Sequence, residues 1–526
     1  MSTFLENLND DGAPQGTIES DCCIVGAGPA GLTLARALAD HGLTVTLVDR
    51  GAHRPCEAAH EEALEFVRNE YRGATIGRAF GWGGTSALWG GQLMPVRADD
   101  LEARPWCGKP PWPIGASEIE RYLPKLHDWL GVSRSNYDSS VLRSLGHPLG
   151  ALEWGVFSPR FSKWIRFSAR NLAVAWRGIL ARSGRVRVLV NARVTGGNSI
   201  DGDQGRSLSA IHVESPRGRK LRVEANRVIL AAGALASTAL VQRLSDGVVS
   251  SSSTGSLSDH LSLRIAEVDV RDPSAWRTLF APFFEGDTMR SLRMEMPLEH
   301  LRSKGLPAFY VHFVSETPEK TGFANLRCLF RELQRRDVAG VLRNAIPVVG
   351  SLPEIAAIAW WRYARRRLYH PAGSRTFVHV DFEQNYDAEN WVEGIGAASD
   401  GLRIAWAPGA PPETLVSSVS SSLQDFWLNN LLCRVARLRF LSPSELAACW
   451  PNNAHDIFHP ACTLPMGTSL GRPSVDSDGR VTGFSNLYLA SSAAFPSMGA
   501  ANPTLTVMAL ALRIADSIAE SCEARK

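Results

Sequence analysis

The sequence predicts an α/β protein, in which helices alternate with the strands of a parallel sheet, joined to a second domain. Three observations predict this class: a strand–turn–helix–strand segment at residues 21–51, further strand signals between residues 186 and 238, and alternating strands at 375–384 and 402–406. With 526 residues, 44% of them hydrophobic and 21% charged, the chain could form about three average domains, although large enzymes often have two.

The stretch DCCIVGAGPAGLTLARALADHGLTVTLVDRG (21–51) predicts a nucleotide-binding unit. Gly26, Gly28 and Gly31 have the G-x-G-x-x-G spacing, which permits a tight turn, close approach to a pyrophosphate, and close packing of helix on strand. Asp49 ends the second strand roughly 20 residues further on, where an acid can bind ribose hydroxyls. The segment predicts an adenine-dinucleotide site, but it does not choose between FAD and NAD; a glycine-rich turn without a ligand is the alternative.

A second glycine-rich stretch, AFGWGGTSALWGGQL (79–93), favours a flavin. Backbone amides without Cβ bulk can lie against a flat ring or a diphosphate. The alternative is a surface loop, but Trp82, Leu88 and Trp89 argue against full exposure.

Three further segments with strand signals follow, between residues 186 and 238. Residues 186–194 form a strand, residues 210–225 form a β-hairpin around a Pro-Gly loop, and residues 227–238 run from an apolar strand into a small-residue turn. This order of strand, hairpin and strand is unusual for a plain NAD domain.

Composition excludes several classes of partner. The net charge of +3 gives no argument for nucleic acid, and nine scattered cysteines do not form a disulfide framework. The acidic start has no signal-peptide pattern, and no apolar run approaches the ~20 residues of a membrane span. We therefore expect a cytoplasmic protein that contacts neither nucleic acid nor membrane.

With these motifs in place, the chain resembles the glucose–methanol–choline (GMC) family of FAD-dependent oxidoreductases. The resemblance rests on the dinucleotide motif, the GWGGTSALWGG loop, WPIGASEIERYLPKLHDWLGV (112–132), VILAAGALAST, GSLSDHL (255–261) and NLYLASSAAFPSMGAANPTLTVMALALRIADSI (486–518). It implies an α/β (α+β) fold with two domains: a Rossmann-like FAD-binding domain from residues 1–130, 170–265 and 455–526, and a substrate-binding domain from 131–169 and 266–454. The substrate-binding domain would have an antiparallel sheet flanked by helices.

The resemblance also assigns a catalytic pair. The family has a histidine shortly before a Thr and a Met-Gly, and here His459 precedes Thr463, Met466 and Gly467. A position some forty residues later, His or Asn in the family, is Asn502. The resemblance implies that His459 is the base, which suits an imidazole with an ordinary pKa near 6.5, and that Asn502 hydrogen-bonds the substrate oxygen.

Each of these residues also has a structural interpretation. His459 alone would be a structural histidine, and Asn502 alone would cap the helix that begins at Pro503. His260, which follows Asp259 in a family-like segment, is expected to pack or hydrogen-bond structurally.

The expected FAD contacts come from the same motifs, and no metal site is expected. They are Gly26, Gly28, Gly31, Asp49, Arg50, Gly84, Thr85, Trp89, Gly90, Gly91, Val194, Ala232, Gly233, Ser491, Ser492, Asn502, Pro503 and Thr504.

The chain departs from the family at five positions, and Leu464 and Pro465 stand where the family commonly has Cys and Arg. Cys462 stands where the family commonly has Gly, and Ser491 stands where it has an Asp ahead of the "FP" turn. Leu88 occupies the position at which some relatives attach the flavin through a histidine, so we expect a dissociable flavin.

These inferences lead to an FAD-dependent dehydrogenase or oxidase that acts on CH–OH donors. We expect it to oxidise a primary or secondary alcohol, such as a sugar, glycoside or polyol-like metabolite, to the aldehyde or ketone by hydride transfer to the flavin. Oxygen, a quinone or another compound would accept the electrons. The alternatives are a flavin-containing lyase of the same fold without net redox, and a non-catalytic dinucleotide-binding protein.

Two segments of the middle region leave further alternatives open. Residues 354–370 are apolar and aromatic, then basic; we expect a lid with a solvated basic end rather than a helix on a membrane or around an anionic substrate. In the strand at 375–384, His379, Asp381 and Glu383 share one face, which lines a polar substrate cavity or is solvated.

Overall fold

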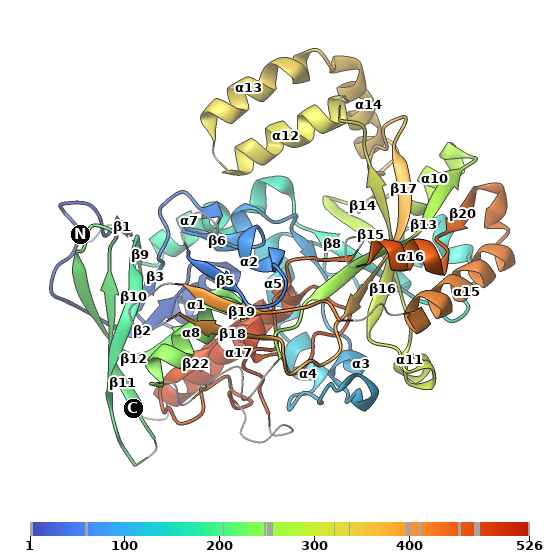
Figure 1. The fold of residues 1–526 in the computed structure, drawn as a ribbon. Coiled ribbons are helices and arrows are strands. Elements are labelled where there is room, and N and C mark those ends of the chain that lie inside the picture. The colour runs from blue at the N-terminus through green and yellow to red at the C-terminus, as the bar shows by residue number, and fades with distance from the viewer. Residues whose placement is uncertain are drawn as a thin grey trace.

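The computed structural model describes residues 4–57, 62–203, 205–246, 249, 256–319, 321–335, 337–395, 401–409, 413–450, 454–467 and 474–523. Two large sheets lie side by side, with helices packed around them and one helical arm projecting from the body (Figure 1). The predicted α/β class is confirmed.

The first sheet is mainly parallel and combines strands from the first half of the chain with one strand from near its C-terminus. Its strands, in spatial order, are β1 (Leu5–Asn7), β9 (Val186–Val190), β3 (Val45–Val48), β2 (Thr17–Val25), β12 (Lys220–Leu230), β11 (Ser207–Glu214) and β10 (Arg193–Ile200), with β22 (Leu487–Leu489) beside β12. The predicted hairpin is confirmed, because β11 and β12 pair antiparallel with Ile211 opposite Val223. The small residues after β12 do more than turn the chain: helix α8 (Gly233–Leu244) begins among them.

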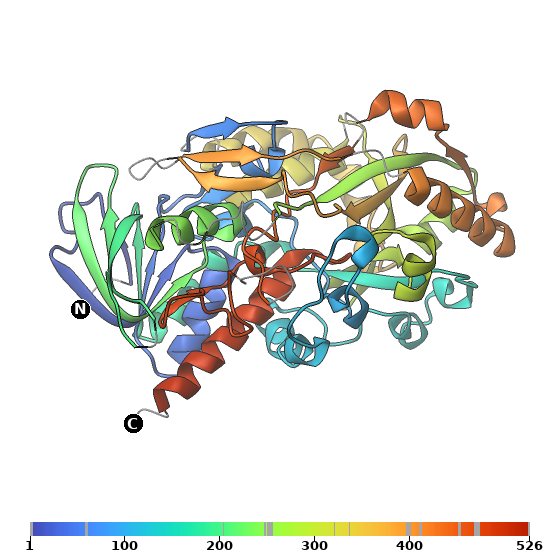
Figure 2. The same ribbon diagram turned by 60° about the horizontal axis from the view of Figure 1, so that its bottom comes forward.

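Helices cover the parallel sheet, as expected for strands that are apolar throughout. Helix α1 (Pro29–Asp40) follows β2, and the C-terminal helix α17 (Pro503–Glu523) lies along it (Figure 2). Helix α7 (Leu172–Arg182) also packs against α1. The C-terminal helix α17 thereby lies beside the helix that follows the first glycine motif.

The second sheet is antiparallel and has nine strands. They are β20 (Ala436–Phe440), β13 (His260–Val270), β17 (Arg375–Glu383), β16 (Phe309–Glu316), β15 (Thr288–Glu295), β8 (Ser158–Trp164) and β7 (Gln92–Leu93), with β14 (Phe283–Glu285) beside β15 and β21 (Ala454–Asp456) beside β13. Helices α10 (Pro273–Phe280), α11 (Leu298–Lys304), α15 (Glu413–Asn429) and α16 (Pro443–Cys449) lie around it (Figure 1). Strand β17 is buried on both faces, so the alternative of a solvated polar face is wrong.

Smaller elements connect the two sheets. A three-stranded sheet is formed by β18 (Trp391–Gly394), β19 (Leu402–Ala405) and β5 (Leu64–Phe66), and β4 (Cys56–Glu57) pairs with β6 (Ala79–Phe80). Short helices complete the connections: α2 (Arg72–Thr75), α3 (Ala98–Leu101), α4 (Ala116–Glu120), α5 (Leu123–Leu130), α6 (Ser140–Ser144) and a 3-10 turn at Gly84–Ala87.

The core consists of two main clusters, one per large sheet. The cluster under the parallel sheet also takes in Val132 and Ile165, and the cluster under the antiparallel sheet takes in Tyr71, Leu257 and Leu261. Each core thus includes residues that the predicted limits assign to the other domain, and those limits stay a prediction.

A helical arm leaves the body between β16 and β17. It consists of α12 (Gly322–Arg335), α13 (Val338–Val349) and α14 (Leu352–Tyr363) (Figure 1). No single helix among the described residues is long and apolar enough to cross a bilayer; α13 and α14 reach that length only together, and they are bent by 93° to each other. The segment expected to act as a lid thus forms α14 and an irregular basic stretch after it.

Candidate FAD and substrate site

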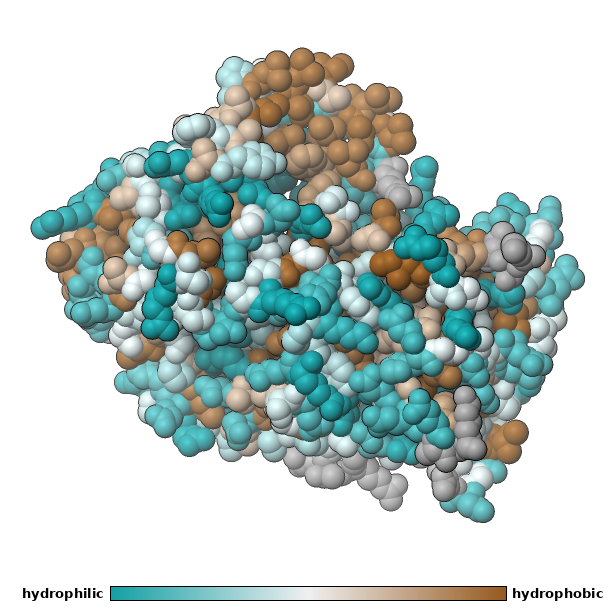
Figure 3. Space-filling view, turned by 180° about the vertical axis from the view of Figure 1, so that it is seen from behind, coloured by the Kyte–Doolittle hydropathy of each residue, from teal (hydrophilic) through white to brown (hydrophobic). Residues whose placement is uncertain are grey.

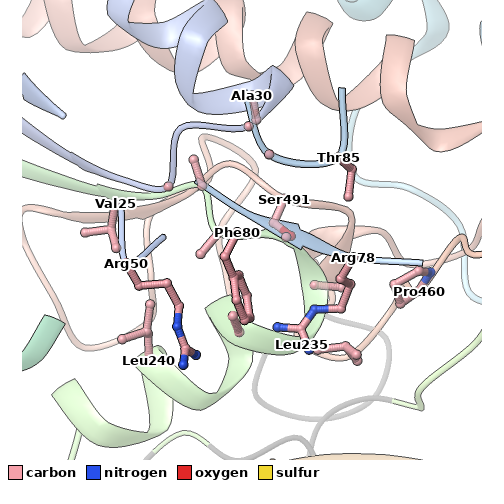
Figure 4. Close-up of a pocket in the computed structure, with 18 of the residues that line it drawn as sticks. Val25, Ala30, Arg50, Arg78, Phe80, Thr85, Leu235, Leu240, Pro460 and Ser491 are labelled. Atoms are coloured by element: carbon pink, nitrogen blue, oxygen red, sulfur yellow. The ribbon is translucent and has the colours of Figure 1, made fainter. Parts of the chain in front are cut away.

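A deep pocket opens where the strands of the parallel sheet end, and it encloses about 1500 Å³ of empty space including its open mouth. The carboxyl ends of β2, β3, β12 and β22 all reach it, through Gly26, Asp49, Ala231 and Ala490. Ligands of open α/β sheets bind at this edge. Figure 4 shows the pocket with Arg50, Phe80 and Arg78 along one side.

The first glycine motif has the geometry that a pyrophosphate requires. Gly26 has a φ of +109°, which strongly favours glycine, and a Cβ on Gly31 would lie 1.9 Å from the carbonyl oxygen of Gly26. Gly28 differs: it lines the pocket at the N-cap of α1, and a Cβ there would meet no protein atom within 4 Å. Open space at Gly28, beside the free amides of the helix N-terminus, fits the phosphates of a bound dinucleotide. Gly31 acts through packing and does not line the pocket.

Asp49 lies in the pocket wall, but most of its carboxylate is already engaged. Its Oδ2 accepts the N–H of Ala27 at 2.7 Å, and its Oδ1 accepts those of Gly51 at 2.9 Å and Gly81 at 2.8 Å. Burial raises the pKa of Asp49 to about 6 despite these bonds and the charge of Arg50. Asp49 therefore links the two glycine-rich loops, with one Oδ2 lone pair remaining for a ribose hydroxyl.

The predicted contact Arg50 lies in this half of the pocket, together with Arg78 and Phe80, which the sequence analysis did not name. Arg50 Nη1 donates to Glu62 Oε1 at 2.9 Å, and Arg78 Nη1 donates to Glu62 Oε2 at 2.6 Å. The Arg50 guanidinium lies 4.2 Å from the centre of the Phe80 ring. The only sequence signal for them is that Arg78 directly precedes the second glycine-rich stretch and Phe80 lies within it.

The second glycine loop contributes through its 3-10 turn, and its later part lies elsewhere. Gly84 and Thr85 line the pocket, whereas Trp89, Gly90 and Gly91 do not. The Trp89 indole donates to the carbonyl of Arg170 at 2.8 Å, and a Cβ on Gly90 would lie 3.0 Å from the Trp164 ring. These later residues pack the loop against β8 and the segment before α7.

The remaining expected FAD contacts are brought to the same pocket from distant parts of the chain. Lining residues are Val194, Ala232, Gly233, Ser491, Ser492, Pro503 and Thr504. Ser491, which replaces the family's Asp, accepts the N–H of Ala493 at 3.2 Å through its own hydroxyl, and Ser492 Oγ donates to the carbonyl of Pro460 at 2.7 Å. The second bond fixes the turn beside His459.

His459 lines the pocket, and Asn502 adjoins it. The Asn502 amide nitrogen lies 3.3 Å from His459 Nε2, and its Oδ1 accepts a hydrogen bond from Arg293. The Arg293 contact settles the orientation of the amide, because a guanidinium can only donate. Asn502 therefore directs its N–H toward His459.

The contact between His459 and His260 determines which ring nitrogen of His459 carries a hydrogen. His260 Nε2 lies 2.8 Å from the carbonyl oxygen of Gly499, which can only accept, so this nitrogen carries a hydrogen. In the neutral ring, His260 Nδ1 is then an acceptor, and His459 Nδ1, at 3.1 Å, is the donor. His459 Nε2 is left with its lone pair directed toward Asn502. His260, which we expected to be structural, thus sets the tautomer of His459.

Burial, with the nearby His260 and Arg293, holds the pKa of His459 well below its usual value. Burial also lowers the pKa of His260. Both imidazoles are therefore neutral at physiological pH, which is the form that the hydrogen-bond chain requires.

The backbone around His459 is held by a carboxylate. Both oxygens of Asp259 accept the His459 N–H, at 2.9 and 3.0 Å, and Tyr71 donates its hydroxyl to Asp259 at 2.5 Å. Phe458 and Cys462 have φ values of 67° and 66°, a conformation that non-glycine residues rarely adopt. The conformation of Cys462 explains why glycine suits this position, and such strain is concentrated at functional sites.

Arg293 is a further residue of the candidate site that the sequence analysis did not name. It comes from β15, is buried, and lies 3.8 Å from the centre of the Tyr310 ring. No motif surrounds it, and it meets Asn502 across 209 residues of sequence.

Two acidic side chains of β17 are paired with neighbouring groups. Glu383 accepts hydrogen bonds from Arg104 at 2.7 Å and from the N–H of Met498 at 2.6 Å, and Lys109 lies 3.6 Å away. Asp381 pairs with His312 at 3.2 Å. Within the described ranges, no group of three or more His, Cys, Asp or Glu is arranged to hold a metal ion.

Comparison with known proteins identifies the class as flavin-dependent oxidoreductases. A family model described as FAD dependent oxidoreductase matches residues 21–289, more than half of the chain, and one described as GMC oxidoreductase matches residues 369–511. An uncharacterized GMC-type oxidoreductase of Sinorhizobium fredii (strain NBRC 101917 / NGR234) is 42% identical over 59 residues, which are 11% of this chain and 12% of that protein.

Solved structures share the fold. The pyridoxine 4-oxidase of Mesorbium loti has a TM-score of 0.59 at 16% identity, covering 94% of this chain and 98% of that one. A formate oxidase variant of Aspergillus oryzae RIB40 has a TM-score of 0.56 at 13% identity, covering 98% and 100%.

The chain belongs to the GMC family of FAD-dependent oxidoreductases, and its cofactor is FAD. The pocket fits that cofactor, since the open space at Gly28 and the lining of glycines and small residues leave room for a flat, extended ligand.

Proposed function

We propose that this flavoprotein oxidises a primary or secondary alcohol to the aldehyde or ketone, with His459 as the base. The observation that carries the proposal is the hydrogen-bond chain from the Gly499 carbonyl through His260 to His459, which leaves a lone pair on His459 Nε2 beside the Asn502 N–H. A substrate hydroxyl placed between these two groups would donate to the imidazole and accept from the amide.

The protein's part in the reaction is to hold and move one proton. His459 Nε2 takes the hydroxyl proton, and His260 accepts the Nδ1–H of the resulting imidazolium. Asn502 stabilises the developing alkoxide; Arg293 polarises that amide by donating to its oxygen, which makes the N–H a better donor. Bound FAD would supply the acceptor for the hydride that leaves the same carbon.

The residues that would hold FAD divide into three groups. Gly26, Gly28 and the start of α1 suit the pyrophosphate, Asp49 and Arg50 suit the adenosine half, and Gly84, Thr85, Ser491 and Thr504 suit the remainder of the pocket. We propose a sugar, glycoside or polyol-like substrate, which is supported by the buried polar side chains of β13 and β17, among them His260, Ser262 and His379.

An anaerobic screen of sugars, glycosides and polyols, followed by the flavin absorbance, tests this function. A substrate should bleach the flavin; product formation without bleaching would instead support the lyase alternative. Repeating the assay with an active substrate in air and with a quinone identifies the electron acceptor.

His459→Ala should bind FAD normally and slow flavin reduction by about 10²–10⁴-fold. The control His212→Ala, on the remote strand β11, should not slow it. Unchanged reduction in His459→Ala would refute the assignment.

A further inference from the structure

The helical arm formed by α12, α13 and α14 carries an exposed apolar surface that the catalytic proposal does not use. Of the eighteen large hydrophobic side chains exposed among the described residues, nine lie between residues 322 and 363. Figure 3 shows the resulting hydrophobic patch at the end of the arm. Isolated exposed hydrophobics need no explanation, but a contiguous patch of this kind marks an interaction surface.

The apolar side chains form one continuous face. Val338, Leu342, Ile346 and Val349 follow helical spacing along α13 and are 66%, 67%, 78% and 65% exposed. Leu352 continues the face at the start of α14, at 61% exposed. The 93° bend between the two helices presents this face at the tip of the arm.

A basic and aromatic belt adjoins the apolar face. Residues 338–370 contain five arginines and a single acid, Glu354, which accepts a hydrogen bond from the Gly322 N–H within the arm. Arg343 and Arg365 are exposed and have no carboxylate partner among the described residues. Trp360 and Tyr363 are 62% and 77% exposed beside these charges. Segments that lie in the interface of an anionic bilayer typically combine an apolar surface with amphipathic aromatic residues and arginines, as this arm does.

The arm is fixed to the body, and it does not fold over the pocket. The Phe330 ring stacks on Phe167 with centroids 4.8 Å apart, and Gln334 donates to the carbonyls of Ser86 and Trp89. Arg362 contacts Asp287 at 3.3 Å at the other end. No described residue of the arm lines the FAD pocket, so the structure gives no support to the lid expected from the sequence.

We propose that the arm docks this enzyme onto the surface of an anionic lipid bilayer, with α13 and the start of α14 inserted among the headgroups. A second copy of the chain fits less well, because a symmetric contact through this face would bring the arginines of one copy against those of the other. This proposal replaces the expectation of no membrane contact, because the sequence does not show that the apolar face of α13 is exposed. It does not depend on the substrate or on His459.

Vesicle flotation of the full-length, FAD-loaded protein tests the proposal. Vesicles of phosphatidylcholine with phosphatidylglycerol (about 7:3) should carry the protein to the top of a density gradient, and vesicles of pure phosphatidylcholine should carry far less. Leu342→Asp/Ile346→Asp should weaken partitioning at least about tenfold. The matched control Ile200→Asp/Leu428→Asp changes residues of similar exposure (62% and 65%) away from the arm, and it should float like the wild type.

A second pair of variants tests the charged belt. Arg343→Glu/Arg365→Glu should lose most of the binding to anionic vesicles, whereas Arg54→Glu/Arg437→Glu, on exposed sites outside the arm, should retain it. Flavin absorbance and the thermal midpoint verify that each variant is folded and loaded. Failure of the wild type to float, or equal flotation of the arm variants, would overturn the proposal. So would sedimentation velocity showing a dimer that the Asp variants dissociate, with no lipid binding by the wild type.

Discussion

His260 Nδ1 lies 3.1 Å from His459 Nδ1, and this contact decides which nitrogen of His459 is free to accept a proton. The donor is His459 because the other nitrogen of His260 is committed to the Gly499 carbonyl. One imidazole therefore orients another, in the way that a carboxylate orients the histidine of other catalytic sites.

We expect His260→Ala to slow flavin reduction by about 10²-fold, because the tautomer and the ring orientation of His459 are then no longer fixed. His260→Asn, whose amide oxygen can accept the Nδ1–H, should recover part of the rate. Stopped-flow reduction measures both, and bound flavin should stay near one per chain. Equal rates for the alanine and asparagine variants would argue against the tautomer role.

The positive charge of Arg293 should affect the pH dependence of kcat/KM. Because burial, His260 and Arg293 hold the pKa of His459 below its ordinary 6.5, the wild-type rate should fall on acidification only well below pH 6.5. Arg293→Gln removes a cation and so stabilises the imidazolium, which should shift the acid limb upward toward 6.5. Arg439→Gln, on the exposed face of β20, should leave the limb in place. The limb is read from kcat/KM between pH 4.5 and 8.

Two glycines of one motif should respond differently to alanine. Gly28→Ala meets no protein atom, so the protein should fold with an unchanged thermal midpoint but bind FAD more weakly, by tenfold or more. Gly31→Ala places a Cβ 1.9 Å from the Gly26 carbonyl and should lower the free energy of unfolding by about 3 kcal/mol or prevent folding. Titration of the apoprotein with FAD and thermal melts separate the two effects. A Gly28→Ala protein with wild-type affinity would contradict the placement of the pyrophosphate.

Removal of the Glu383 charge should destabilise the protein. Glu383→Gln leaves the buried Arg104 without its anion, and breaking such a pair costs about 3–5 kcal/mol. Burial alone would raise the pKa of Glu383, but Arg104 and Lys109 outweigh it and hold that pKa below the usual 4.5. The stabilisation is therefore present above pH 4.5 and is lost as the pH falls through the lowered pKa. Urea unfolding at pH 7 and pH 4 should show a smaller pH effect in the variant than in the wild type.

The local parts of the fold could be predicted from the sequence. The strand, turn and helix around Gly26 and Gly28 depend on neighbours within a few residues, and the hairpin at β11 and β12 carries its own turn signal. His459 and Asn502 were indicated by resemblance to a family, and their juxtaposition became visible only in three dimensions.

Other features could not be predicted because they depend on long-range packing. His260 meets His459 across 199 residues, and the engagement of Asp49 by Gly81 requires the second glycine loop to fold back. The apolar face of α13 carries no sign in the sequence of being exposed, since an identical pattern serves equally well in a core helix.

The two sheets supply different parts of the site, and this should affect the order in which a refolding chain regains cofactor binding and activity. The parallel sheet supplies most of the wall around the cofactor, whereas His260 and Arg293 come from strands of the antiparallel sheet. A refolding chain in which only the part around the parallel sheet has folded would bind FAD and be coloured, but it would have no activity. The visible spectrum of bound flavin should then recover before the turnover rate does. The delay between the two would measure how long the antiparallel sheet takes to pack against the cofactor-binding part.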